Sequence, residues 1–287
     1  MPLLEIRNLS KSYKNVDALK KMNFCVNAGE IVALLGENGA GKTTLLNSIA
    51  GKIYPTEGDI IYKGETLLQK ESRLNEFGIL IEPTFIPYMN AYDNLSILLK
   101  TTGVKNVKNQ INDLLKLVGL EHKKKEKTKA FSFGMRQRLG LAQALLNNPN
   151  FLILDEPFVG LDPSGKSIFK KIIIQKAREE KVGILFSSHN LEDVEEICDR
   201  IVFIDNGKKK YDGAVEYDKK YILKCDNNID EDTKVILSNC NIKNNHVIVD
   251  RAEDLGSAFF KLSEVGIKVI DLKIKQKSLY DFFEKGR

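Results

Sequence analysis

Short apolar runs alternate with amphipathic stretches over the first 213 residues of the chain. Five runs have the length and branching of buried strands, at 31–35, 77–81, 151–154, 182–186 and 201–204. Residues 3–9 alternate like a half-buried strand, and residues 22–26 are another strand candidate. Between them, Ile111, Leu114, Leu115 and Val118 share one helical face, and a helix capped by Ser164 is predicted to run to about residue 180. This alternation predicts an α/β fold.

The pattern changes near residue 213, which predicts a second domain. Short strand candidates follow at 221–223, 235–237, 247–249 and 269–272, with one helix over 252–265 and a terminal helix beginning at Ser278. We therefore expect an α/β domain over 1–213 and a small α+β accessory domain over 214–287. Within the first, residues from about 86 to 148 are predicted to be a helical subdomain, in which Asn90 caps a helix that begins at Ala91.

Composition narrows the class of protein. The 287 residues carry a formal charge of +5, and lysine clusters such as residues 122–127 and 208–210 fit a solvated face better than an anion-binding surface. No apolar run approaches the roughly 20 residues of a membrane span, and no signal-peptide core opens the chain. The four cysteines are scattered without a C-x-x-C pair. These features predict a soluble, cytoplasmic protein.

A phosphate-binding loop lies between the strand at 31–35 and a following helix. Residues 36–43 read G-x-x-x-x-G-K-[ST], and strand, glycine loop and helix together are the structural context that this motif requires. Glycines let successive backbone N–H groups and the helix N-terminus face a polyphosphate. Lys42 would reach the β and γ phosphates, and the Thr43 hydroxyl would bind Mg²⁺. The predicted nucleotide-binding residues here are Gly36, Asn38, Gly39, Gly41, Lys42, Thr43 and Thr44.

Two adjacent carboxylates, Asp155 and Glu156, end the apolar strand at 151–154. An aspartate at this place in a phosphate-loop protein holds Mg²⁺. Because adjacent strand residues point to opposite sides, Glu156 is free to face the γ-phosphate and an attacking water. We therefore expect Asp155 to be a metal ligand and Glu156 to be catalytic.

Other candidate residues follow strand ends or begin helices, and their positions leave two interpretations open. Tyr13 fits an adenine-stacking ring or a packing tyrosine, and Glu82, before Pro83, fits a site residue or an exposed loop carboxylate. His189 follows the strand at 182–186 and fits a ligand-edge residue or a structural histidine. Ser132 and Gly134 begin a helix and offer a hydroxyl and free N–H groups to an anion.

In this order, the phosphate loop, the segment 131–135, the Asp155-Glu156 pair and His189 resemble the ATPase subunit of an ATP-binding cassette (ABC) transporter. The resemblance covers about residues 2–213. It implies a P-loop ATPase core with a RecA-like sheet, an antiparallel β subdomain and a helical subdomain. ATP and Mg²⁺ are the implied cofactors.

The resemblance also implies individual roles. Tyr13 would stack on adenine, Glu156 would be the general base, and His189 would contact the γ-phosphate. Glu82 would sense Mg²⁺ and water, joining Thr43 and Asp155 at the metal, and would signal to the membrane partner.

A head-to-tail pair of subunits with two ATP molecules between them is implied as well. Ser132 and Gly134 would contact the γ-phosphate of ATP bound by the other subunit, and Asp162 would link the two sites. The pair can be a homodimer or a heterodimer with a related ATPase. The resemblance further implies a separate transmembrane permease as partner, with membrane contact on the inner face through that permease only.

The sequence departs from the family pattern at two places. Phe133 and Met135 replace the first glycine and the glutamine of the Leu-Ser-Gly-Gly-Gln signature, and Glu82 replaces a glutamine. A carboxylate near Mg²⁺ binds the metal more strongly and repels phosphate oxygens, so coupling to the permease is expected to differ. Glu82, residues 91–95 and the long C-terminal extension are similar to ATPases of bacitracin- and lantibiotic-type peptide export and immunity.

The alternative function is a non-transport cassette ATPase that acts on DNA or the ribosome. Repair ATPases of this kind insert a coiled coil or zinc modules, and ribosome-associated ones carry two cassettes, whereas this chain shows one cassette without such insertions. Its lysine clusters lack interleaved aromatic residues, so no nucleic-acid partner is expected.

Overall fold

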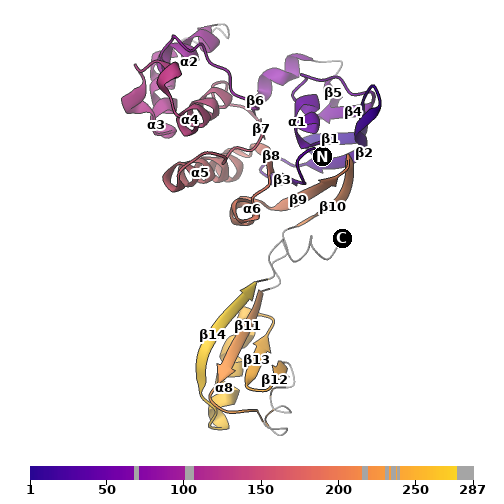
Figure 1. Cartoon of the computed structure of the whole chain (residues 1–287), viewed down its shortest axis with the longest axis vertical. Coiled ribbons are helices and arrows are strands. Elements are labelled where there is room, and N and C mark those ends of the chain that lie inside the picture. Colours follow the sequence, from indigo (N-terminus) through magenta and orange to yellow (C-terminus); the bar gives the residue numbers. More distant parts are fainter. Residues whose placement is uncertain are drawn as a thin grey trace. The chain divides into compact units, whose positions relative to one another are not determined.

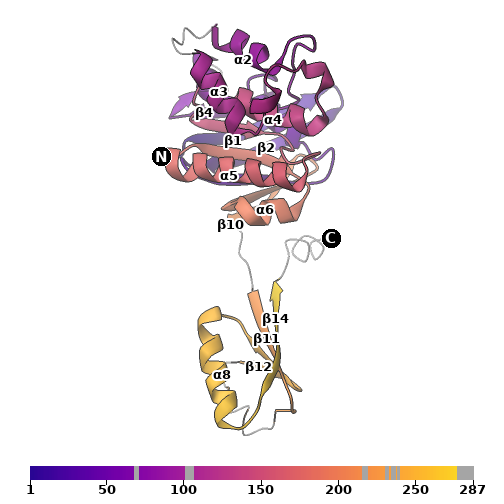
Figure 2. The same ribbon diagram turned by 90° about the vertical axis from the view of Figure 1, so that its left-hand side faces the viewer.

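The computed structural model describes residues 1–67, 71–100, 107–214, 219–229, 233, 237 and 240–276. The chain divides into two compact units, Met1–Val215 and Glu216–Arg287. Figures 1 and 2 show the two units in two views. The first unit contains the phosphate loop, and each unit has its own hydrophobic core.

A six-stranded sheet forms the centre of the first unit, in the order β10-β9-β3-β8-β7-β6. All its strand pairs are parallel except β9 with β10, which form a hairpin. The strands are β3 (Ile31–Leu35), β6 (Phe77–Leu80), β7 (Phe151–Leu154), β8 (Gly183–Ser188), β9 (Arg200–Asp205) and β10 (Lys208–Ala214). Every residue of β3, β7 and β8 is buried, as continuous apolar runs in a covered parallel sheet require.

A second sheet of the first unit is antiparallel, in the order β2-β1-β4-β5. It consists of β1 (Leu4–Tyr13), β2 (Val16–Val26), β4 (Glu57–Tyr62) and β5 (Glu65–Thr66). Its buried face joins one core with β3 and with α1 (Lys42–Ile49), the helix that follows the phosphate loop. This packing fixes the loop between two sheets.

Helices complete the first unit. Figure 1 shows α2 (Ala91–Lys100), α3 (Val107–Leu117) and α4 (Phe133–Ala144) gathered as a group. Short 3₁₀ turns occur at Glu71–Glu76, Glu121–Lys123 and Thr128–Ala130. Two further helices, α5 (Pro163–Glu180) and α6 (Leu191–Ile197), follow β7 and β8. The parallel strands, the antiparallel sheet and the helical group confirm the predicted α/β cassette fold.

The second unit is a four-stranded antiparallel sheet with one helix. The strand order is β12-β13-β11-β14, from β11 (Lys219–Cys225), β12 (Asn241–Lys243), β13 (His246–Val249) and β14 (Val269–Gln276). A 3₁₀ turn, Ala252–Asp254, leads into α8 (Leu255–Glu264), which lies against one face of the sheet (Figure 2). Ala258 and Leu262 of α8 pack on Leu223 and Val247 to form the core of this unit.

Some sequence-based predictions differ from the structure. Ser164 does not cap α5, because the Asp162 carboxylate accepts the Gly165 N–H bond and the helix begins at Pro163. The Ser164 hydroxyl instead donates to Asp162 at 2.7 Å. The predicted helix over 252–265 begins as a 3₁₀ turn. The terminal helix at Ser278 and most of the predicted strand at 235–237 lie outside the described residues.

Among the helices of the described ranges, none is long and apolar enough to cross a bilayer.

Candidate functional site

The phosphate loop lies tightly against the backbone of β2 and β9. Gly36, Gly39 and Gly41 have φ of 154°, 84° and 108°, the left-handed side that glycine adopts freely. A Cβ atom on Gly36 would lie 2.3 Å from the Ile204 carbonyl oxygen, and one on Gly41 would lie 2.5 Å from that of Ala18. Only glycine fits at these two places, so the loop shape depends on both.

Donor groups of the loop converge on its interior. The buried Lys42 ammonium donates to the Gly36 and Glu37 carbonyls at 2.6 and 3.0 Å, which holds the amine across the loop. Helix α1 begins at Lys42 without a side-chain cap and without an acidic residue in its first turn. Its first N–H groups therefore remain available to an anion, as phosphate binding at a helix N-terminus requires.

Thr43, Asp155 and Ser187 form a polar chain beside the loop. The Thr43 hydroxyl donates to Asp155 Oδ2 at 3.0 Å, and the buried Ser187 hydroxyl donates to Asp155 Oδ1. Asp155 directly follows β7 and Ser187 lies in the neighbouring β8, so the parallel register brings them together. A hydroxyl and a carboxylate at this distance are ligands that Mg²⁺ prefers. The donor set fits the predicted metal.

Glu156 is held from two directions. Its N–H donates to Ser187 Oγ at 2.8 Å, and its carboxylate Oε2 lies 2.9 Å from His189 Nδ1. The backbone of Glu156 has φ of 45°, a left-handed conformation that is uncommon for a residue with a side chain. This conformation turns the Glu156 side chain toward His189 while Asp155 stays with Thr43. The two carboxylates thus have different partners. Both residues lie beyond the end of β7, so the left-handed backbone of Glu156, and not strand alternation, accounts for the difference.

A cavity of about 570 Å³ opens over these groups. Its lining includes the loop residues Asn38, Gly39, Gly41, Lys42, Thr43 and Thr44, both carboxylates, residues 15–18 and the turn at Asn206 and Gly207. The turn is tied to the loop because the Gly207 N–H donates to the Ala40 carbonyl at 3.0 Å. The volume, the free N–H groups and the lysine fit a nucleoside triphosphate.

Ser187 was not among the residues predicted from the sequence. It links the Asp155 carboxylate and the Glu156 backbone to β8, because its hydroxyl donates to the first and accepts the N–H bond of the second. Its only signal in the sequence is its place at the end of an apolar strand, two residues before His189. A serine at the end of a strand is common and does not by itself indicate a site residue. The bonds of Ser187 to Asp155 and Glu156 could therefore be recognised only from the structure.

Ser132, Gly134 and Asp162 do not line this cavity. Ser132 caps α4 by accepting the Met135 N–H bond, and a Cβ atom on Gly134 would lie 2.9 Å from the Gly160 carbonyl oxygen. The segment 132–134 therefore packs directly on the turn that leads to Asp162. Bonds from the Ser164 hydroxyl and the Gly165 N–H hold the pKa of Asp162 below its usual range. These residues form a second, separate group in the first unit.

Glu82 is also outside the cavity lining. It lies exposed just after β6, with φ of 48°. The next residue, Pro83, packs on α4, since a Cβ atom on Gly140 would lie 2.8 Å from Pro83 Cβ. The Asp155 N–H donates to the Leu80 carbonyl at 2.8 Å, so the end of β6 lies next to Asp155. Through Pro83, the same strand end also contacts α4, the helix that Ser132 begins.

Tyr13 ends β1 and pairs with Val16 across the hairpin. Its ring is 44% exposed, with the Lys11 ammonium 5.0 Å from the ring centre. Tyr13 is not among the residues that line the cavity, although Asn15 and Val16 of the same hairpin are. The stacking role of Tyr13 stays a prediction.

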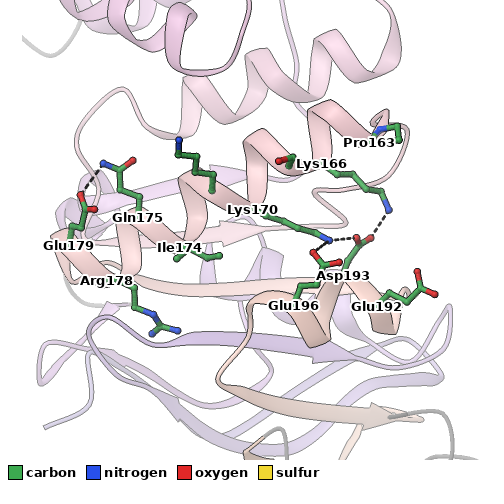
Figure 3. A pocket seen from close by; sticks show the side chains of 12 residues that line it. Pro163, Lys166, Lys170, Ile174, Gln175, Arg178, Glu179, Glu192, Asp193 and Glu196 are labelled. Atoms are coloured by element: carbon green, nitrogen blue, oxygen red, sulfur yellow. Dashed lines mark hydrogen bonds and ion pairs between the residues drawn. The ribbon is translucent and has the colours of Figure 1, made fainter. Parts of the chain in front are cut away.

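A second cavity, of about 970 Å³, lies along α5 and α6 (Figure 3). Lys166 and Lys170 point into it, but both bind the buried Asp193 carboxylate at 2.8 Å, and Lys170 also binds Glu196 at 2.6 Å. Their charge is neutralised by these carboxylates, which stabilise the contact between α5 and α6. This cavity lacks the glycine loop and free N–H groups of a phosphate site.

Comparison with known proteins gives a consistent result. Residues 19–159 match the family model described as ABC transporter. The chain is 42% identical over 217 residues to the uncharacterized ABC transporter ATP-binding protein YxlF of Bacillus subtilis (strain 168), covering 75% of this chain and 72% of that protein. It is 38% identical over 226 residues to the bacitracin transport ATP-binding protein BcrA of Bacillus licheniformis, covering 77% and 74%.

The lantibiotic transport ATP-binding protein SrtF of Streptococcus pyogenes is 40% identical over 217 residues, covering 74% of this chain and 93% of that protein. Among solved structures, one described as the ATP binding subunit of an ABC transporter has a TM-score of 0.69 at 28% identity, covering 91% of this chain and 99% of that one.

These matches define the class as ATP-binding cassettes, and the chain belongs to the ATP-binding proteins of ABC transporters. It is an ATPase and the ATP-binding subunit of a transporter complex. The family predicted from the motifs is thereby confirmed.

Proposed function

We propose that this chain hydrolyses ATP to drive a separate membrane permease that exports a peptide antibiotic, so that the cell resists or is immune to it. Two relatives support the substrate class, because their names assign them to bacitracin and lantibiotic transport. The chain would lie on the inner face of the membrane through its permease. The observation that carries the hydrolytic part is the bonded series Thr43, Asp155, Ser187, Glu156 and His189 beside the phosphate loop.

In the proposed mechanism, the loop N–H groups and Lys42 bind the β and γ phosphates and offset the charge that develops on the γ-phosphoryl group. Thr43 and Asp155 would hold Mg²⁺. A bound Mg²⁺ would supply positive charge that offsets the negative charge of the phosphates. Glu156 accepts a proton from the attacking water, and its fixed backbone keeps the carboxylate directed at that water. His189 orients Glu156 through Nδ1, and in the doubly protonated form of the ring its Nε2–H would donate to the γ-phosphate.

The proposed unit of hydrolysis is a head-to-tail dimer, either of two copies or of this chain with a related ATPase. The separation of Ser132, Gly134 and Asp162 from the cavity in one chain supports this arrangement, because these groups then remain available to the nucleotide of a second subunit. Ser132 is exposed at the start of α4. Its hydroxyl and the neighbouring N–H groups suit a phosphate oxygen.

Glu82 is the residue through which we propose that ATP hydrolysis is coupled to the permease. It follows the strand beside Asp155, and its neighbour Pro83 packs on α4. A movement of the residues around the bound metal would therefore be transmitted through Pro83 to α4 and the helical group. A carboxylate here adds negative charge at the strand end next to Asp155.

The proposal is tested by expressing the chain with its neighbouring permease in a bacterium that is sensitive to bacitracin and to lantibiotics. We expect the minimum inhibitory concentration of at least one of these peptides to rise, and the rise to disappear with Lys42→Ala. Affinity purification of the chain from membranes should recover the permease, identified by mass spectrometry. Resistance that survives Lys42→Ala, or no resistance to either peptide class with the permease present, would refute peptide export.

A further inference from the structure

The second unit leaves one edge of its sheet unpaired among the described residues. β14 bonds to β11 along one side, and within the described ranges no strand pairs with its other side. The exposed edge is eight residues long. An edge of this length presents a row of free N–H and C=O groups to another strand.

Apolar side chains accompany this free edge. Leu272 lies opposite Leu223, which is fully buried in the core of the unit, and Ile274 lies opposite Tyr221, which packs against that core. Residues directly opposite in an antiparallel pair share a face, so Leu272 and Ile274 lie on the face that α8 covers. They are nevertheless 42% and 59% exposed. The part of this sheet face that β14 contributes is therefore not fully buried by α8.

The helix itself adds apolar surface. Phe259 and Phe260 of α8 are exposed, as is Ile270 at the irregularity in β14. Singly exposed apolar residues are ordinary on a protein surface, but Leu272 and Ile274 share one face of a strand with a free edge, where a paired strand would cover them.

The order of residues along β14 indicates which strand fits this edge. The central residues read Asp271-Leu272-Lys273. If two copies of β14 pair antiparallel about a two-fold axis at Leu272, Asp271 of each copy lies opposite Lys273 of the other. Leu272 then lies opposite itself. Asp271 and Lys273, which already lie 3.9 Å apart as an ion pair along the strand, each gain an opposite charge across the axis, and the apolar residue meets an identical residue.

Other registers match less well, although an axis at Lys273 would also set Asp271 opposite Lys275. An axis at Lys273 or at Asp271 sets identical charges opposite each other, which is destabilising. A shift by one residue sets a charged side chain opposite Leu272. One register of this strand against itself is therefore preferred on charge alone.

From this complementarity we propose that β14 is a homodimerisation surface. Two second units join through antiparallel β14 strands, with Leu272 on the axis, into one continuous eight-stranded sheet. The pairing forms without nucleotide. It does not rest on the function proposed above, because none of the phosphate-site residues takes part.

Charge exchange in the full-length chain tests the register. Sedimentation of the nucleotide-free protein should show a monomer–dimer equilibrium. Asp271→Lys and Lys273→Asp each convert two opposite-charge pairs into like-charge pairs, and each should weaken the dimer by roughly tenfold or more. The double variant D271K/K273D restores opposite charges across the axis and should recover the wild-type dissociation constant. A monomeric wild-type chain, or a double variant as weak as the singles, overturns the proposal.

Asp271 also lies opposite Lys224 within its own sheet, so charge variants at position 271 change a contact inside the unit as well. Cross-linking provides a second test that leaves these charges intact. Leu272→Cys should form a disulfide between two copies under mild oxidation, since directly opposite Cα atoms in an antiparallel pair are about 4.5–5.5 Å apart. Peptide mapping distinguishes this bond from bonds of the four native cysteines. The matched control is Ser263→Cys, exposed on α8, which should not cross-link. Equal cross-linking of both variants, or none at position 272, contradicts the proposed axis.

Discussion

The imidazole Nδ1 of His189 lies 2.9 Å from Oε2 of Glu156, although the two residues come from different strand ends. The Glu156 N–H bond to Ser187 fixes the other end of the same residue. Glu156 is thus oriented by two contacts, from its backbone to Ser187 in β8 and from its side chain to His189 just after β8. The predicted general base is part of a rigid arrangement.

Replacement of this carboxylate is the most direct test of its role. Glu156→Gln keeps the size and the backbone bond but removes the proton acceptor, so ATP turnover should fall by about 10²–10⁴-fold. Because ATP binding is retained, the variant should accumulate an ATP-bound dimer. Phosphate release and size-exclusion chromatography with ATP measure the two effects. The exposed Glu57→Gln serves as control, and wild-type turnover in Glu156→Gln would contradict the assignment.

His189→Ala should also slow hydrolysis, by about 10²–10³-fold, because the γ-phosphate loses a donor and Glu156 loses its orienting contact. ATP binding, measured by a fluorescent analogue, should change little, since Lys42 and the loop are untouched. His122→Ala, at an exposed position of the helical group, is the matched control. A variant at position 189 with normal turnover and weakened binding would assign the histidine to nucleotide binding only.

Ser187→Ala should affect both folding and the metal. It leaves the Glu156 N–H and Asp155 Oδ1 without the hydroxyl that they share, which should lower the free energy of unfolding by about 1–3 kcal/mol. Half-maximal hydrolysis should also require more Mg²⁺, since Asp155 is then less firmly oriented. Ser188→Ala provides the comparison, because the Ser188 hydroxyl bonds to the backbone of Asn190 and not to Asp155 or Glu156. We expect Ser188→Ala to leave the Mg²⁺ requirement unchanged.

The contact between Phe133 and Gly160 predicts non-additive stability effects. A Cβ atom on Gly160 would lie 2.3 Å from Phe133 Cδ1, and φ of Gly160 is 70°. Gly160→Ala should therefore destabilise the first unit by about 1–3 kcal/mol, through overlap and backbone strain. With Phe133→Ala in the background the overlap disappears, and the cost of Gly160→Ala should drop. A double-mutant cycle in urea measures the coupling, and strict additivity would show that the ring does not rest on this glycine.

A pH effect on stability is expected at Glu76. Burial alone would raise the pKa of Glu76, but bonds from Lys63, Arg73 and Asn150 outweigh it and lower the pKa from 4.5 to about 2. A lowered carboxyl pKa stabilises the fold above pH 4.5, and this contribution is lost as the pH falls toward 2. The difference in urea midpoint between wild type and Glu76→Gln should therefore shrink between about pH 6 and about pH 3. Glu121→Gln, exposed in the helical group, should show no such trend.

Local signals explain how much of the site could be predicted. The phosphate loop is a contiguous motif between a strand and a helix, so residues 36–44 could be assigned without tertiary contacts. Asp155 and Glu156 were found because both follow an apolar strand. Alternation of side chains along a strand is the reason to expect different partners for the two carboxylates. Both residues lie beyond the end of β7, and their separate bonds to Thr43 and His189 accompany the left-handed backbone of Glu156, which no strand pattern indicates.

Contacts between distant segments could not be predicted in the same way. Ser187 meets Asp155 only because β7 and β8 are adjacent, and Phe133 meets Gly160 only because α4 packs on the turn before α5. The error at Ser164 has a local cause. Asp162 and Ser164 are both good capping residues two positions apart, and Pro163 suits the first helical position, which favours the aspartate as cap.

Glu156 adopts a left-handed backbone, and this restricts which amino acids can occupy position 156. Glycine, asparagine and aspartate tolerate the conformation, whereas valine, isoleucine and threonine are disfavoured there by their branched Cβ atoms. Inactive descendants of this enzyme should therefore carry the tolerant residues at this position. Substitution of Glu156 by a β-branched residue would destabilise the fold as well as remove the general base, so the two effects could not be separated in an activity assay.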